Sequence, residues 1–82
     1  MVTSALIIGY GKFGKIIETI LKNYSSLDYS IYDPHIPEYA HNLQEKVNTS
    51  DLVIIAVPLD FFKDSILEIT PFLKKEHTVI EV

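Results

Sequence analysis

The 82-residue sequence contains no cysteine and no arginine, and its apolar runs are short. Without cysteine there is no disulfide framework, no thiolate zinc site and no cysteine nucleophile, which fits a reducing compartment and predicts a cytoplasmic protein. Seven lysines against eleven acidic residues give a net charge of −4, a poor basis for binding nucleic acid. The longest apolar runs, Ala5–Ile8 and Leu52–Pro58, fall far short of the ~20 residues that span a bilayer, so no membrane association is expected.

What is present suffices for one small folded domain. The chain is 48% hydrophobic, which is enough for a compact core. Four segments are predicted to be strands of a parallel sheet, because most of them are apolar on both faces and such strands are covered by helices on both sides. These segments are Ala5–Ile8, Tyr29–Tyr32, Leu52–Val57 and His77–Val82.

Helical patterns alternate with these strands. Apolar residues recur every three or four positions over Lys12–Asn23, a short helix is expected over Leu43–Val47, and Asp60 is expected to cap another that ends before Pro71. The alternation predicts an α/β fold with a doubly wound parallel sheet of Rossmann type. Because the chain stops inside the last predicted strand, we expect a sheet truncated after about the fifth strand position.

A glycine motif of the form G-x-G-x-x-G follows the first strand and opens the first helix. It consists of Gly9, Tyr10, Gly11, Lys12, Phe13 and Gly14. In a dinucleotide site Gly9 would allow the tight turn, Gly11 would let a pyrophosphate approach the backbone, and Gly14 would let helix and strand pack closely. The free amides near Lys12 and Phe13 would face the anion. The alternative is an ordinary glycine-rich connection.

Asp33 lies at the end of the second predicted strand, 19 residues after Gly14. Dinucleotide-binding folds place a ribose-binding carboxylate about 20 residues after the glycines. Such an acid accepts hydrogen bonds from the ribose hydroxyls and repels a 2′-phosphate, so the sequence predicts NAD rather than NADP. The alternative is that Asp33 only begins the turn with Pro34.

The predicted strand Leu52–Val57 supplies the other side of the expected site. Ligands of doubly wound sheets collect where the strand order reverses, outside the carboxyl ends of the strands. We therefore expect Ala56, Val57, Pro58 and Leu59 to line the side of the cofactor opposite the glycine loop. Phe61 is predicted to belong to the core together with Phe62, with the wall of this crevice as its alternative.

The runs LIIGYGKFG (Leu6–Gly14) and SDLVIIAVPLDFFKDSILEITPFLKKEHTVIEV (Ser50–Val82) resemble the N-terminal cofactor-binding domain of prephenate and arogenate dehydrogenases, within the 6-phosphogluconate-dehydrogenase-like group of Rossmann enzymes. The similarity spans nearly the whole chain. The short connection between Asp33 and Ser50 is similar to that of family members in which the third strand is nearly lost.

The resemblance implies NAD-dependent oxidative decarboxylation in tyrosine biosynthesis, by a parent protein that is a homodimer. It matches Gly9, Gly11 and Gly14 to the family's glycines, Asp33 to its ribose acid, and the Val57-Pro58 pair to the strand end beside the cofactor. The family's catalytic histidine, substrate-binding arginine and helical dimerisation domain follow the matched segment. Residues 1–82 are therefore expected to be a partial dinucleotide-binding domain, without catalytic residues and with the small-molecule substrate bound elsewhere.

Two alternatives remain open. A regulatory nucleotide-sensing module of the kind that gates potassium transport also begins with GYGxxG, and another reductase of the same group would share these motifs. The histidines at positions 35, 41 and 77 have no metal-ligand spacing, so turn or surface roles and no metal site are expected.

Overall fold

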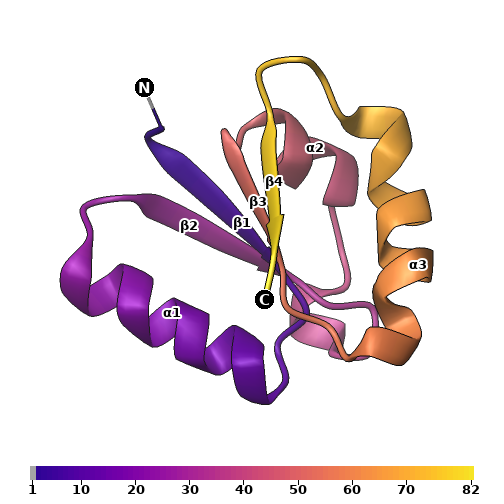
Figure 1. The fold of residues 1–82 in the computed structure, drawn as a ribbon, viewed down its shortest axis with the longest axis horizontal. Helices are drawn as coiled ribbons and strands as arrows, with labels where there is room; N and C mark the ends of the chain where they lie inside the picture. The colour runs from indigo at the N-terminus through magenta and orange to yellow at the C-terminus, as the bar shows by residue number, and fades with distance from the viewer. Residues whose placement is uncertain (1) are drawn as a thin grey trace.

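The computed structural model describes residues 2–82. Four parallel strands form one sheet in the order β2-β1-β3-β4, as Figure 1 shows. The strands are β1 (Ser4–Ile8), β2 (Asp28–Tyr32), β3 (Leu52–Ile55) and β4 (Thr78–Glu81). The chain passes from β1 to β2 on one side of β1 and then returns to β3 on the other side of β1. The strand order therefore reverses between β1 and β3. This doubly wound parallel sheet confirms the predicted fold class.

Helices cover both faces of the sheet. They are α1 (Lys12–Tyr24), α2 (Leu43–Asn48) and α3 (Leu59–Ile69), with short 3₁₀ turns at Pro37–Tyr39 and Thr70–Phe72. In Figure 1, α1 lies on one side of the sheet and α2 and α3 on the other. Among the described residues no helix has both the length and the apolar character needed to cross a membrane.

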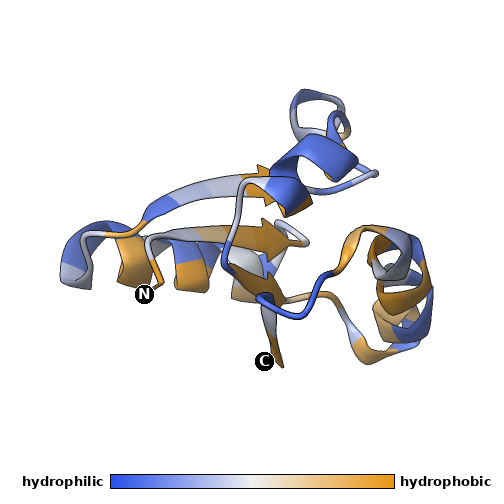
Figure 2. Cartoon of the chain, turned by 90° about the horizontal axis from the view of Figure 1, so that it is seen from above, coloured by the Kyte–Doolittle hydropathy of each residue, from blue (hydrophilic) through white to orange (hydrophobic). Residues whose placement is uncertain are grey.

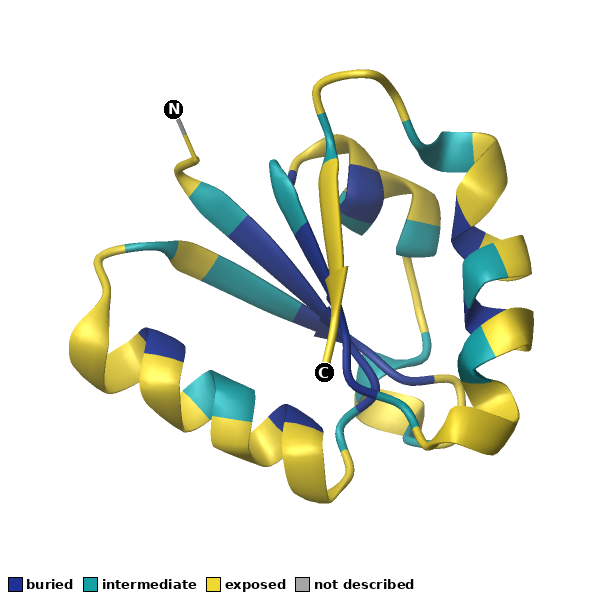
Figure 3. Ribbon diagram, viewed as in Figure 1, coloured by how far each residue is buried: buried dark blue, intermediate teal, exposed yellow. Residues whose placement is uncertain are grey.

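Alternate residues of the central strands build two separate cores. Leu6 and Ile8 pack toward α2 and α3, whereas Ala5 and Ile7 pack toward Leu21 of α1. Figure 2 shows the hydrophobic carboxyl halves of the central strands, and Figure 3 shows that burial is concentrated in β1 and β3. The continuous apolar runs in the sequence follow from this arrangement, because both faces of these strands are covered.

Two predicted boundaries are wrong. Strand β3 ends at Ile55 rather than Val57, because the chain turns away before Pro58, which has no N–H to continue a ladder. Asp60 does not cap α3: the helix begins one residue earlier, at Leu59, with Pro58 in the capping position. Asp60 therefore lies in the first turn, where its charge still complements the helix dipole.

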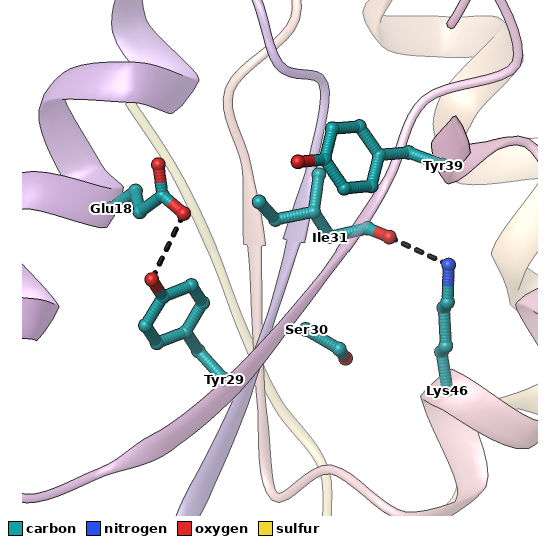
Figure 4. A pocket seen from close by; sticks show the side chains of 6 residues that line it. All are labelled: Glu18, Tyr29, Ser30, Ile31, Tyr39 and Lys46. Atoms are coloured by element: carbon teal, nitrogen blue, oxygen red, sulfur yellow. Dashed lines mark hydrogen bonds between the residues drawn. The ribbon is translucent and has the colours of Figure 1, made fainter. Parts of the chain in front are cut away.

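A lysine of α2 covers part of the free edge of β2. The chain between β2 and β3 holds only a 3₁₀ turn and α2, and no strand of residues 2–82 pairs with the outer side of β2. Lys46 of α2 instead donates a hydrogen bond to the carbonyl oxygen of Ile31 at 2.7 Å (Figure 4). Desolvation lowers the pKa of Lys46. A lysine placed at the edge of a sheet opposes the pairing of that edge with a strand of another chain.

Asp51 joins the beginnings of β1 and β3 and gives the fold a pH dependence. Its Oδ2 accepts hydrogen bonds from the Thr3 amide and hydroxyl, both at 2.9 Å, and from the Ser4 amide at 3.3 Å. The backbone hydrogen bond from Thr3 is the main cause that lowers the pKa of Asp51 below its usual 3.8.

We expect Asp51→Ala to lower the free energy of unfolding near neutral pH. The difference in this free energy between the variant and the unsubstituted protein is expected to narrow as the pH falls. A depressed carboxyl pKa contributes stability that is present above the unfolded-state pKa and is lost as the pH falls through the folded-state pKa. Urea unfolding of both proteins between pH 7 and pH 2 measures this difference. A difference in free energy of unfolding that is as large at pH 2 as at pH 7 would contradict the assignment.

Candidate functional site

A hollow of about 190 Å³ opens at the carboxyl end of the sheet, where the strand order reverses. Three segments far apart in the sequence meet there: the turn after β1, the turn after β2, and the segment from the end of β3 into α3. The lining residues are Gly9, Gly11, Asp33, Pro34, His35, Ala56, Val57, Pro58, Phe61 and Ser65. Ligands of open α/β sheets bind at this position.

The turn after β1 depends on two glycines. Gly9 has a φ of +97°, a left-handed conformation that other residues rarely adopt, and its amide donates to the Tyr32 carbonyl at 2.8 Å. A Cβ on Gly9 would lie 2.7 Å from Cγ1 of Val57. A Cβ on Gly14 would overlap the carbonyl oxygen of Gly9. The first turn of α1 therefore packs directly on the turn that precedes it.

The amino-terminal end of α1 presents free amides. Among residues 2–82, no group accepts a hydrogen bond from the amides of Gly11, Lys12 or Phe13, and no side chain caps the helix. A Cβ on Gly11 would have no neighbour within 4 Å, so the space beside this backbone is open. Free amides at the positive end of a 13-residue helix form an anion-binding arrangement.

The carboxylate of Asp33 is held in place by two backbone amides. Its Oδ2 accepts from the Tyr10 amide at 2.8 Å and its Oδ1 from the His35 amide at 2.9 Å. Asp33 is 9% exposed and lines the hollow. Asp33 does shape the turn, and this geometry is compatible with the expected binding role as well, since a carboxylate has about four lone-pair positions and two remain for hydroxyl donors.

The remaining predicted site residues are placed as follows. Pro34, Ala56, Val57 and Pro58 line the hollow, but Leu59 does not, because it is 86% exposed at the start of α3. The side chains of Tyr10, Lys12 and Phe13 do not line it either, and Gly14 lies behind the turn. What Lys12 and Phe13 offer near the hollow is their unpaired backbone amides.

The sequence reasoning missed part of the lining. His35 is exposed in a turn, as expected, but its ring also lines the hollow, with its centroid 5.9 Å from that of Phe61, and Ser65 lines the same hollow. Phe61 is 49% exposed and walls the hollow, so its predicted core position is wrong, whereas Phe62 does pack against the core. The sequence feature that could have indicated the position of Phe61 in the wall is its place three residues after Pro58, on the first turn of a helix that starts at the hollow.

The other two histidines lie away from the hollow. His77 accepts from the Lys74 amide through Nδ1 at 2.8 Å, so its Nε2 carries the proton and donates to the Val47 carbonyl at 2.9 Å. This ring joins α2 to the segment before β4. His41 is exposed, and within the described part of the chain no three His, Cys, Asp or Glu side chains are placed to hold a metal ion.

The hollow can hold part of a ligand that carries both an anion and a diol. Its volume is below the ~300–1,000 Å³ of complete small-molecule sites, which fits one wall of an extended site. Free amides of α1 and a fixed carboxylate lie on the same side of the sheet end. A comparison with protein-family models and with curated proteins finds no match for this chain.

Proposed function

We propose that this chain is an NAD-binding domain and that its parent protein is a dehydrogenase of the prephenate or arogenate type. The single observation that carries the proposal is the convergence of three segments on one hollow at the reversal of strand order. An ordinary glycine-rich turn would not also require free helix amides, a fixed carboxylate and the end of β3 at the same place. The dehydrogenase type rests on the sequence resemblance.

The described residues fit the dinucleotide. The amides of Gly11, Lys12 and Phe13 would hold the diphosphate, and the open space beside Gly11 leaves room for it. Asp33 would accept hydrogen bonds from the adenosine ribose, and Val57 would form part of the opposite wall. When bound, NAD supplies the hydride acceptor. The chain's own residues bind and orient it, and the substrate would be held outside this chain.

The charge around Asp33 favours NAD over NADP. The carboxylate repels a 2′-phosphate, and the chain has no arginine to receive one. The next lysine after Asp33 is Lys46, which is engaged by the Ile31 carbonyl at the edge of β2. No lysine side chain lines the hollow among the described residues.

We expect the protein to bind NAD at least ~10-fold more tightly than NADP, a difference of about 1.4 kcal/mol. Isothermal titration with NAD, NADP and ATP in one buffer measures this preference. Equal affinities for NAD and NADP would overturn the role of Asp33. Tighter binding of ATP than of NAD would favour the nucleotide-sensing module instead of the dehydrogenase.

A further inference from the structure

The carboxylate of Glu18 lies outside the hollow and contacts a residue of the glycine turn. Glu18 of α1 accepts a hydrogen bond from the Tyr10 hydroxyl through Oε1 at 2.5 Å, and one from the Tyr29 hydroxyl through Oε2 at 2.9 Å. We call these three residues the Glu18 clamp. Figure 4 shows Glu18 and Tyr29 beside Tyr39, in a second hollow along β2. None of the clamp side chains lines the hollow at the end of the sheet.

Tyr10 connects the clamp to the candidate site. It stands between Gly9 and Gly11, and its amide donates to Asp33 while its hydroxyl donates to Glu18. The ring of Tyr10 also packs edge-on against Tyr39, with centroids 5.1 Å apart. One residue of the turn is thus fixed through its amide, its ring and its hydroxyl, so a change at Glu18 reaches both the turn and the carboxylate of Asp33.

The phenols remain hydrogen-bond donors over the pH range in which the protein would work. The hydrogen bond to Glu18 is the largest cause that raises the pKa of Tyr10 to about 12, and it also raises the pKa of Tyr29. Both phenols therefore keep their protons above neutral pH and can donate them to Glu18. This supports a permanent positioning contact rather than a pH switch.

We propose that Glu18 is a positioning residue for dinucleotide binding, acting through Tyr10 on the glycine turn and on the carboxylate of Asp33. The inference rests on the proposed function and deepens it. Glycines on both sides of Tyr10 would leave the free turn many conformations, and their loss on binding would weaken affinity. The clamp removes this freedom before the ligand arrives. Affinity for NAD therefore depends on a carboxylate that does not touch it.

The test compares Tyr10→Phe and Glu18→Ala, singly and together, in the whole protein by titration with NAD. Each single change is expected to raise the Kd for NAD about 3- to 10-fold, which corresponds to about 0.7–1.4 kcal/mol, because the turn must then be ordered on binding. The double variant is expected to be no weaker than the worse single variant. Two residues acting through one hydrogen bond are not additive.

Tyr32→Phe is the matched control. It removes the same kind of bond, from the Tyr32 hydroxyl to Glu68 at 2.8 Å, on the face of the sheet that packs against α3. We expect a lower melting temperature and an unchanged Kd for NAD. If Glu18→Ala fails to fold, Glu18→Gln replaces it, because its amide oxygen can still accept from one phenol.

The outcomes separate the two proposals. If the protein without substitutions does not bind NAD, both the proposed function and this inference are overturned. A parent that binds NAD, with Tyr10→Phe binding equally well, overturns the inference alone. Additive effects in the double variant, or an equal loss of affinity in Tyr32→Phe, show general destabilisation and also overturn it.

Discussion

Replacing Gly14 with alanine is expected to lower the stability of this domain strongly. The new methyl group would overlap the carbonyl oxygen of Gly9, a backbone atom that cannot rotate away as a side chain can. Overpacking of this kind typically costs 1–3 kcal/mol, and a rigid backbone neighbour places the change at about 3 kcal/mol. In an 82-residue domain that loss lowers the melting temperature by roughly 12–24 °C, measurable by circular dichroism.

Gly11→Ala is the matched control for Gly14→Ala. Its φ of −90° lies outside the left-handed region, and its Cβ would meet nothing within 4 Å, so the melting temperature is expected to fall much less than in Gly14→Ala. The methyl group would instead occupy the open space beside the free amides and weaken NAD binding at least ~10-fold. A Gly14→Ala protein as stable as Gly11→Ala would contradict the packing of α1 on the glycine turn, because alanine is otherwise the better helix former.

The fold was predictable because its signals are local and redundant. Runs that are apolar on both faces predict covered parallel strands, and α1 carries a long periodic apolar pattern. The errors fell at element ends. The end of β3 and the start of α3 depend on how Pro58 turns the chain between sheet and helix, and the apolar run through Val57 gives no sign of that turn.

The candidate site was predictable where its geometry is set by the backbone. The spacing of Gly9, Gly11 and Asp33 reflects one strand, one turn and one crossover, so it can be read along the chain. The ring pair of His35 and Phe61 depends instead on how two distant loops approach each other. Tyr10 of the glycine motif and Tyr29 of the second predicted strand share one carboxylate, and nothing in their sequence spacing indicates this.

The amides that hold Asp33 have a consequence for its replacement. Because Tyr10 and His35 both donate to the carboxylate, its orientation is set before any ligand binds. Asparagine would present an NH₂ group to one of these amides and lose that bond, so Asp33→Asn changes position as well as charge. Affinity for NAD alone would not separate the two effects, whereas the ratio of NAD to NADP affinities does.

We expect Asp33→Asn to weaken NAD binding about 10- to 100-fold and to bring the NAD-to-NADP affinity ratio close to 1. A hydrogen bond to a charged group contributes about 1.5–3 kcal/mol, which gives the fall for NAD. For NADP the loss of repulsion toward the 2′-phosphate offsets part of the damage. General distortion of the turn would lower both affinities equally and leave the ratio unchanged.

Asp28→Asn provides the control for net charge. Asp28 begins the same strand β2 that Asp33 follows, and it is exposed at the opposite end of the sheet. The substitution removes one negative charge without touching the hollow. Because Asp28 lies farther from the hollow than the screening length of ~8–10 Å, its charge has little effect there. The affinities for NAD and for NADP, and their ratio, are therefore expected to stay within about twofold of those of the unsubstituted protein. If Asp28→Asn shifts the ratio as much as Asp33→Asn, cofactor choice reflects the overall charge of the domain. If only Asp33→Asn shifts it, one carboxylate held between two amides makes that choice.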